Sequence, residues 1–285
     1  MSSTGWTLKA LPQMSDQQFL LWQELLESRT GIYLTEQRKS FLESSLMQRM
    51  REIECPDYEA YYQRIVNDPM GRIEWAALID RLTVQETRFF RDPSALEYVA
   101  KYIKRVSQHV DKKNPLDMWS VGCSSGEEVY SLAMLASEAL PKDKQDYFMV
   151  TGTDISVPVL NKARQGLYSA RRVEALTDHY RKRYFVPKDN GFVVTDELKR
   201  HTCFAQVNVL EIDSVPTTGR HIIYCQNLLI YFRRWRRQEI LNHLVDRLLP
   251  GGLLLIGMGE VVDWSHPQLD AIKGQSITAF VKREV

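Results

Sequence analysis

A turn of small residues followed by two carboxylates could bind a ligand or catalyse a reaction. Gly122, Ser124 and Gly126 follow an apolar stretch, and Glu127 and Glu128 begin the helical pattern after them. A turn of this kind between a strand and a helix can bind the pyrophosphate of a dinucleotide or expose a nucleophilic serine. It can also surround the amino-acid end of S-adenosyl-L-methionine, so the neighbouring residues must decide between three chemistries.

Two of these chemistries fit the neighbouring residues poorly. Ser124 replaces the middle glycine of the dinucleotide pattern G-x-G-x-x-G, and carboxylates in the first helical turn would repel a pyrophosphate. Residues 122–126 do match the hydrolase pattern G-x-S-x-G, with Ser124 as the nucleophile. A hydrolase of that fold has several strands before this turn, whereas only helical patterns precede it here. A cationic ligand suits Glu127 and Glu128 better, because opposite charges attract.

A second acidic position supports a ligand that contains a ribose. The strand pattern "YFMVTGTD" (147–154) ends at Asp154, whose carboxylate could accept both hydroxyls of a ribose. The alternative is that Asp154 is only a turn residue or the N-cap of the helix that follows. Together with the small-residue turn and the two glutamates, Asp154 predicts a site for S-adenosyl-L-methionine.

Composition narrows the class of protein. Of the residues, 44% are hydrophobic and 26% are charged, and the formal net charge of +1 gives no overall field that would hold nucleic acid. The four cysteines lie far apart without a C-x-x-C pair, so we expect neither a metal site nor a disulfide framework. The sequence predicts no signal peptide and no membrane insertion, and reduced thiols indicate a cytoplasmic protein. We expect a monomer.

Two regions of different pattern position the candidate residues. Apolar residues recur at helical spacing through residues 15–82, which predicts an all-α N-terminal domain at residues 1–82. Strand and helix patterns then alternate, which predicts an α/β domain at residues 83–285 with a parallel sheet covered on both faces. Residues 166–200 interrupt this alternation and predict an inserted β-subdomain, with a hairpin whose turn is Asn190-Gly191.

Five motifs occur along the chain in a specific order. They are "ETRFFRD" (86–92), "VGCSSGEEVYSLA" (121–133), "TGTDIS" (151–156), "QVNVL" (206–210) and "CQNLLIYF" (225–232). In this order they resemble the CheR-type chemotaxis receptor methyltransferases, and the resemblance covers nearly the whole chain. It implies a Rossmann-like class I methyltransferase domain with a small β-subdomain, preceded by a helical domain.

The same resemblance implies a reaction and a partner. The methyl group of S-adenosyl-L-methionine would be transferred to glutamate side chains in the cytoplasmic domain of a methyl-accepting chemoreceptor, with S-adenosyl-L-homocysteine as the other product. A glutamate carboxylate is already ionised at neutral pH, so this transfer needs no general base.

Individual residues match functional positions of the family. Arg91 and Tyr231 match the methyl-transfer site, and Arg51 matches a basic position that faces the receptor. Arg91 could bind the acceptor carboxylate in a two-pronged way. Its structural alternative is a pair with Asp92 or Glu86, and that of Tyr231 is a core aromatic. The residues expected to contact the cofactor are Gln85, Thr87, Arg91, Gly122, Glu128, Asp154, Asn208, Val209, Gln226 and Asn227.

Departures from the family pattern leave two alternatives open. Gln85 stands where asparagine is usual, Gln226 replaces an arginine, and Ser45 falls where another arginine is often found. A non-catalytic module that binds the cofactor is one alternative. The other is a methyltransferase for a small molecule or for RNA, whose phosphates the arginines of "FRRWRRQ" could contact.

Overall fold

The chain divides into two compact units, one ending at residue 84 and the other starting at residue 85. The computed structural model describes residues 13–83, 86–189, 191–214, 219–273 and 276–284. Two residues named in the sequence analysis, Gln85 and Asn190, lie outside these ranges. Within them, no helix has the length and apolar character needed to cross a membrane.

All the regular secondary structure in the described residues of the first unit is helical, which confirms the predicted all-α domain. Ser15 caps α1 (Asp16–Thr30): its hydroxyl accepts the N–H of Gln18, and the Gln18 side chain accepts the N–H of Ser15. The helix ends at Gly31, whose φ of 75° favours glycine. The other elements are the 3₁₀-helix η1 (Glu36–Arg38), α2 (Lys39–Glu52), α3 (Tyr58–Asn67) and α4 (Gly71–Leu82).

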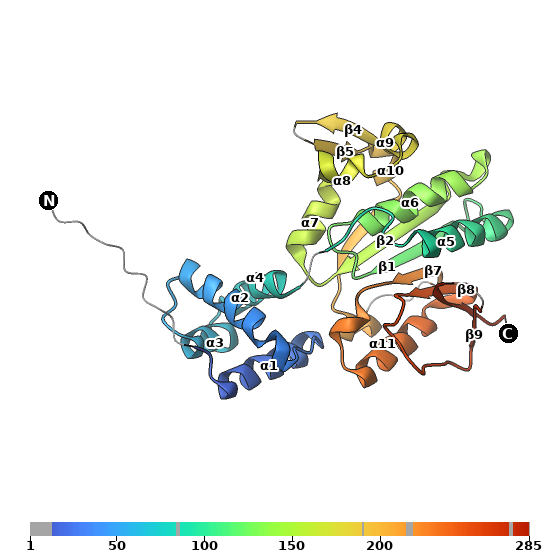
Figure 1. The fold of residues 1–285 in the computed structure, drawn as a ribbon. Helices are drawn as coiled ribbons and strands as arrows, with labels where there is room; N and C mark the ends of the chain where they lie inside the picture. The colour runs from blue at the N-terminus through green and yellow to red at the C-terminus, as the bar shows by residue number, and fades with distance from the viewer. Residues whose placement is uncertain (1–12, 84–85, 190, 215–218, 274–275, 285) are drawn as a thin grey trace. The chain divides into compact units, whose positions relative to one another are not determined.

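The second unit is built around a seven-stranded sheet with the strand order β6-β2-β1-β7-β8-β10-β9 (Figure 1). The first five strands in that order run parallel to one another, as predicted. The prediction is wrong for β10, which pairs antiparallel with both neighbours. The strand β10 follows β9 after the six residues 272–277, which are too few for the crossover that a parallel neighbour requires, and it inserts between β9 and β8. The bounds are β1 (Leu116–Val121), β2 (Phe148–Asp154), β6 (Thr202–Gln206), β7 (Arg220–Cys225), β8 (Leu248–Ile256), β9 (Leu269–Ala271) and β10 (Thr278–Lys282).

Helices cover both faces of this sheet, with α5 and α6 on one face and α11 on the other (Figure 1). Successive strand residues alternate between the two cores, so Met118 of β1 packs with α5 and α6, and Trp119 packs with α11. The helices are α5 (Pro93–Val106), α6 (Glu127–Ala139), α7 (Val157–Gln165) and α11 (Arg234–Asp246), with short 3₁₀-helices η2 (Ser107–His109), η3 (Lys142–Lys144), η4 (Val209–Ser214) and η5 (Leu229–Tyr231).

The inserted β-subdomain is confirmed as a separate antiparallel sheet with the order β3-β5-β4. The predicted hairpin turn is wrong by one residue, because Gly191 pairs with Lys188 and is the first residue of β5. A Cβ atom at Gly191 would lie 2.3 Å from the carbonyl oxygen of Tyr168, so the glycine permits close strand pairing. The elements are β3 (Leu167–Ser169), α8 (Ala170–Glu174), α9 (Asp178–Tyr184), β4 (Phe185–Lys188), β5 (Gly191–Val194) and α10 (Asp196–Lys199).

Candidate functional site

The small-residue turn lies at the carboxyl end of β1, beside the carboxyl end of β2. The N–H groups of Gly122 and Cys123 both donate to the carbonyl oxygen of Thr153, at 2.8 and 2.9 Å. Gly122, Ser124 and Gly126 have φ values of 76°, 50° and 92°, in the left-handed region that favours glycine. The turn therefore needs small residues for its backbone conformation, and this conformation sets the start of α6.

Asp154 binds the turn to the end of β2. One carboxylate oxygen accepts the N–H of Ser124 at 2.8 Å, and the other accepts the N–H of Ser156 at 3.0 Å. The N-cap of α7 is Ser156, so the N-cap alternative for Asp154 is wrong, whereas its role in the turn is real. Each carboxylate oxygen can accept more than one hydrogen bond, so the Asp154 carboxylate could also accept a hydrogen bond from a ribose hydroxyl.

Glu128 lies in the first turn of α6 and points back toward β1. Its carboxyl oxygen accepts a hydrogen bond of 2.6 Å from the hydroxyl of Ser120. Desolvation raises the pKa of Glu128 to about 8, although the Ser120 hydroxyl and the positive charge of Arg91 act in the opposite direction. Without a bound cation the carboxyl is therefore largely protonated at neutral pH, and a cationic ligand would favour its ionised form.

Arg91 does not form the carboxylate pairs that were its structural alternative. Its guanidinium donates to the backbone carbonyl of Glu86 at 2.7 Å. The Asp92 carboxylate instead caps α5 by accepting the N–H of Ala95 at 3.0 Å. Among the described residues no ion pair joins Arg91 to Asp92 or to the Glu86 side chain. The positive charge of Arg91 instead acts on the carboxyl of Glu128, which places Arg91 near that residue at the carboxyl edge.

Aromatic packing positions the segment that precedes Arg91. The ring of Phe89 lies edge-on to the rings of Tyr168 and Phe185, with centroids 4.9 and 5.4 Å apart. Phe90 has a φ of 50°, uncommon for a bulky residue, and its N–H donates to the hydroxyl of Ser131 at 3.0 Å. The β-subdomain and α6 thus hold this segment in place.

Gln226, which stands where the family has arginine, ties the end of β7 to the start of α5. It is buried, its amide nitrogen donates to Asp92 at 3.0 Å, and its amide oxygen accepts from the hydroxyl of Tyr224 at 3.0 Å. The amide therefore satisfies two polar groups without adding a buried charge.

The sequence analysis missed Glu260, which organises the loop after β7. Its buried carboxylate accepts the N–H groups of Asn227 and Gly257, each at 2.9 Å, and of Ile230 at 3.4 Å. Burial raises the pKa of Glu260, and these backbone donors oppose the rise. The available signal was "GMGE" directly after a buried strand, since an acid in such a place needs internal partners.

The remaining predicted residues of this unit lie at the same edge of the sheet. The Asn208 side chain accepts the N–H of Leu210 at 3.1 Å, after the carboxyl end of β6. Val209 and Tyr231 pack half-buried on the core under α11, and Thr87 is half-buried in the segment before Arg91. Because carboxyl ends of parallel strands meet at one edge, the structure gathers these predicted residues there.

Arg51 belongs to the helical unit. It is exposed on α2, whereas Leu42, Leu46 and Met50 of that helix are buried, so Arg51 lies on the opposite side of the helix from its apolar stripe. Ser45 is half-buried, and its hydroxyl donates to the carbonyl oxygen of Phe41 at 2.9 Å.

The residues at the carboxyl edge fit S-adenosyl-L-methionine better than they fit a hydrolase. The Ser124 hydroxyl is buried and has no hydrogen-bond partner among the described residues, so it lacks the base that a nucleophilic serine requires. The orphaned hydroxyl of Ser124 and the buried carboxyl of Glu128 instead fit a ligand with a cationic amino-acid head. Glu128 would bind its ammonium group, and Asp154 its ribose hydroxyls.

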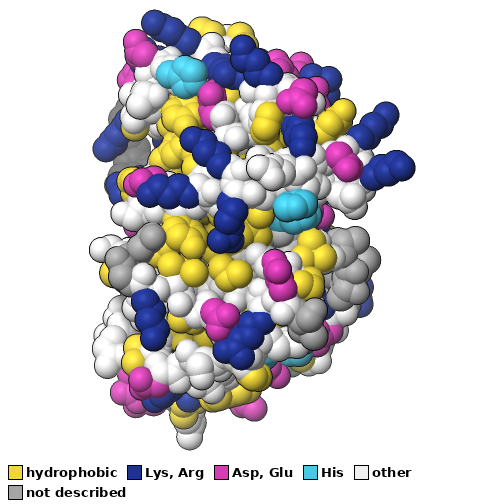
Figure 2. All heavy atoms as spheres, turned by 90° about the vertical axis from the view of Figure 1, so that its right-hand side faces the viewer, with side chains coloured by type: hydrophobic (Ala, Val, Ile, Leu, Met, Phe, Trp, Pro, Cys, Tyr) yellow, Lys and Arg dark blue, Asp and Glu magenta, His cyan; other side chains and the backbone are white. Residues whose placement is uncertain are grey.

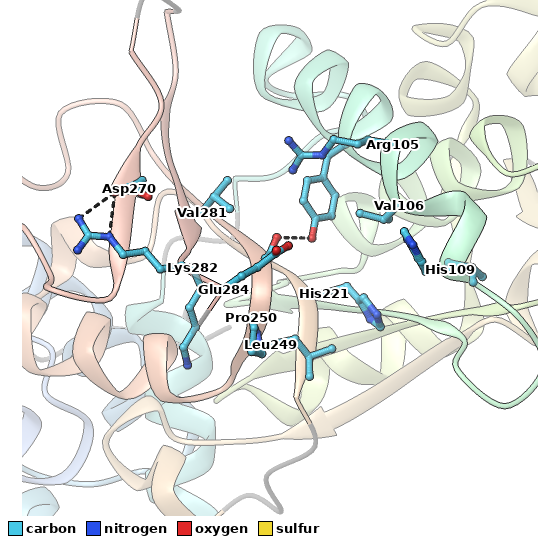
Figure 3. Close-up of a pocket in the computed structure, with 14 residues that line it drawn as sticks. Arg105, Val106, His109, His221, Leu249, Pro250, Asp270, Val281, Lys282 and Glu284 are labelled. Atoms are coloured by element: carbon cyan, nitrogen blue, oxygen red, sulfur yellow. Dashed lines mark hydrogen bonds and ion pairs between the residues drawn. The ribbon is translucent and has the colours of Figure 1, made fainter.

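A cavity of about 710 Å³ lies at the opposite edge of the same sheet, and none of the predicted residues lines it. His109 and His221 lie on one side of it, and Asp270 lies across from them (Figure 3). Figure 2 shows this face of the molecule, where Lys and Arg side chains and a histidine surround exposed hydrophobic surface. Arg283 pairs with Asp270 at 2.9 Å, and the Lys282 ammonium donates to two backbone carbonyls, so much of the lining charge is already matched.

Two family models match the two units. "CheR methyltransferase, all-alpha domain" matches residues 17–83, and "CheR methyltransferase, SAM binding domain" matches residues 85–278. Chemotaxis protein methyltransferase 2 of Vibrio cholerae is 31% identical over 252 residues, which cover 87% of this chain and 86% of the relative. Chemotaxis protein methyltransferase of Escherichia coli is 30% identical over 274 residues, with coverages of 94% and 92%. Chemotaxis protein methyltransferase 2 of Pseudomonas aeruginosa is 32% identical over 241 residues, with coverages of 83% and 84%.

Proposed function

Since the chain belongs to the CheR methyltransferase family, we propose that it transfers the methyl group of S-adenosyl-L-methionine to glutamate side chains of a chemoreceptor. The product would be a glutamate methyl ester in a chemotaxis-type signalling system. The observation that carries the proposal is the pairing of roles at the carboxyl edge, where Glu128 and Asp154 suit the cofactor and the guanidinium of Arg91 suits an incoming carboxylate.

The reaction needs positioning more than proton transfer. S-adenosyl-L-methionine supplies a methyl group activated by its positively charged sulfur. A carboxylate oxygen of the acceptor forms a bond to the methyl carbon while the bond from that carbon to sulfur breaks, which leaves S-adenosyl-L-homocysteine. The acceptor is ionised at neutral pH, so no residue of the chain has to remove a proton.

Four residues of this chain would bind the cofactor and the acceptor. Glu128 would bind the ammonium group and Asp154 the ribose hydroxyls. Arg91 would bind the acceptor carboxylate as it leaves water, since an unpaired anion is costly to desolvate. Tyr231 would direct an acceptor oxygen with its hydroxyl, from the loop that Glu260 holds. This assignment keeps cofactor binding and acceptor binding on different strand ends.

Labelled methyl transfer tests the proposal. The purified chain is incubated with cofactor carrying a labelled methyl group and with a receptor cytoplasmic domain from the same cell, and RNA serves as the control acceptor. We expect label in the receptor domain and its release as methanol in alkali, because methyl esters hydrolyse there. Label that resists alkali, or that enters RNA, would contradict glutamate methylation.

A further inference from the structure

The inserted β-subdomain contacts the small-residue turn directly. The hydroxyl of Tyr168, in β3, donates to the carbonyl oxygen of Ser125 at 2.7 Å. A Cβ atom at Gly126 would lie 3.2 Å from the same hydroxyl oxygen, so the turn packs closely against Tyr168. The Tyr168 side chain is buried. It therefore links the subdomain to the turn that would surround the cofactor.

A buried ion pair makes a second link. Glu127, the first residue of α6, is fully buried, and its carboxylate pairs with the guanidinium of Arg172 from α8. The other carboxylate oxygen accepts the hydroxyl of Ser125 at 2.7 Å, and the Arg172 guanidinium donates to the oxygen of that hydroxyl at 3.4 Å. A buried carboxylate without a counter-charge is costly, so the position of Glu127 depends on Arg172.

The subdomain also contacts the far end of α6. The Glu138 carboxylate accepts the hydroxyl of Tyr184 at 2.9 Å and pairs with Arg183 at 3.1 Å. These contacts join the same subdomain to the same helix through the same residue types. Glu138 lies about 16 Å along the helix axis from Glu127, at 1.5 Å per residue. The two ends of α6 thus provide a matched comparison between contacts that touch the turn and contacts that do not.

The turn depends on contacts from outside itself. Ser124 has a φ of 50° without being a glycine, a conformation that costs free energy and persists where neighbouring groups hold it. Asp154 holds Ser124 from the end of β2, and the β-subdomain holds the residues that follow through Tyr168 and Arg172. Glu128, which would bind the ammonium group of the cofactor, comes directly after the buried carboxylate of the ion pair.

We propose that Tyr168 and Arg172 are positioning residues that hold the turn and Glu128 in the conformation that binds S-adenosyl-L-methionine. The inference rests on the proposed function, because it assumes that the turn and Glu128 bind the cofactor. A site that already has its binding conformation loses less conformational entropy when the ligand binds. The β-subdomain therefore contributes to cofactor affinity through these two residues.

The test compares variants at the turn with matched variants at the far end of α6. Arg172→Met and Tyr168→Phe remove the two links to the turn, and Arg172→Lys keeps the positive charge. Arg183→Met and Tyr184→Phe are the controls, because they remove the same chemical groups from the contacts with Glu138. The Kd of S-adenosyl-L-homocysteine is measured by titration calorimetry well below the melting temperature of each protein, which is measured separately.

We expect Arg172→Met to raise Kd about tenfold and Tyr168→Phe about threefold, the effects of losing a charged and a neutral hydrogen bond. Arg172→Lys should recover most of the affinity, because lysine restores the counter-charge of Glu127. The two controls should stay within about twofold of wild type, whatever the change in their melting temperatures.

Equal Kd values in the turn variants and their controls overturn the inference. Tyr168→Phe keeps the aromatic ring and leaves no buried charge unpaired, so it decides the question even where Arg172→Met does not fold. No recovery in Arg172→Lys overturns the role of the ion pair. A fall of kcat at saturating cofactor with an unchanged Kd also overturns the inference, because Arg172 would then act on transfer.

Asp154→Ala separates this inference from the proposed function. Weaker cofactor binding in Asp154→Ala, but not in Arg172→Met or Tyr168→Phe, overturns the positioning role alone. Unchanged binding in all three variants overturns the proposed cofactor site as well. Because Kd is measured without an acceptor, methyl transfer to an acceptor other than the receptor domain overturns the proposed function and leaves the comparison of Kd values intact.

Discussion

The two edges of the seven-stranded sheet handle charge differently. At the carboxyl edge, the buried Glu127 is paired with Arg172, but Asp154 and Glu260 are held by backbone N–H groups and Glu128 by a hydroxyl. At the amino edge, ionic groups neutralise one another, as in the pairs of Arg283 with Asp270 and of Arg220 with Asp117. The 710 Å³ cavity lies at the amino edge, whereas the carboxyl groups that could bind a cation lie at the carboxyl edge. The buried Glu128, whose ionised form a bound cation would favour, therefore indicates the site at the carboxyl edge.

The largest effect is expected at Arg91, which supplies positive charge to the carboxyl edge. Arg91→Ala should lower single-turnover methyl transfer by roughly 100-fold, because the acceptor loses both its counter-charge and its alignment. Arg91→Lys keeps the positive charge but loses the planar guanidinium with its two parallel donors. Its rate of methyl transfer should fall by roughly tens-fold. Cofactor affinity and melting temperature, measured on the same proteins, should change much less. Wild-type transfer in Arg91→Ala would make this residue structural.

The next effect is expected at Glu128 and depends on pH. Glu128→Gln should weaken cofactor binding roughly tenfold or more, because a hydrogen bond to a charged group is lost. In wild type, binding must first ionise a carboxyl with a pKa of about 8, so affinity should rise as the pH increases from 6 to 8. Titration calorimetry across this range should show a flatter profile for Glu128→Gln. Parallel profiles for the two proteins would exclude Glu128 as the group responsible.

The stability of the cofactor-free protein provides an independent check on Glu128. Its folded pKa of about 8 lies above the ordinary 4.5, so its contribution to stability is fully present below pH 4.5 and is lost as the pH rises toward 8. Glu128→Gln cannot ionise, so its melting temperature should exceed that of wild type more at pH 8 than at pH 5. A gain of about 1 kcal/mol would appear as roughly 2–4 °C.

Asp154→Ala should have a smaller effect on transfer and a visible effect on stability. We expect cofactor affinity to fall about tenfold through lost hydrogen bonds to the ribose. The backbone N–H groups of Ser124 and Ser156 also lose their acceptor, which should cost about 1–2 kcal/mol of unfolding free energy. Denaturant unfolding and cofactor titration measure the two effects separately. Unchanged affinity in the folded variant would remove Asp154 from the ribose site.

The smallest effect on transfer is expected at the amino edge. His221 accepts the N–H of Asp117 at 3.1 Å, and its burial lowers its pKa. His221→Ala should cost about 1 kcal/mol of stability because that N–H loses its partner, while transfer and cofactor affinity stay within about twofold of wild type. A large loss of transfer in this variant would break the contrast between the two edges.

Local patterns were enough to predict many elements and the placement of the turn. The strand pattern at 147–154 matches β2, and Ser15 and Gly31 lie where local capping rules place the ends of α1. Each of these features depends on residues within one or two helical turns, through side-chain periodicity, caps and the φ of glycine. The same local patterns predicted that Asp154 ends a strand and that Glu128 lies in the first turn of a helix, as it does in α6.

The sequence by itself determined which residues end the strands, whereas the tertiary structure decided what those residues touch. Gln226 meets Asp92 across 134 positions, and Glu260 meets Asn227 across 33. Gly191 is explained by the carbonyl of Tyr168 on a neighbouring strand, and β10 runs antiparallel to β9 because the connection between them is too short for a crossover. Periodicity and capping act over a few residues, but the strand order brings distant polar groups together, and a buried polar group must then find its partner there.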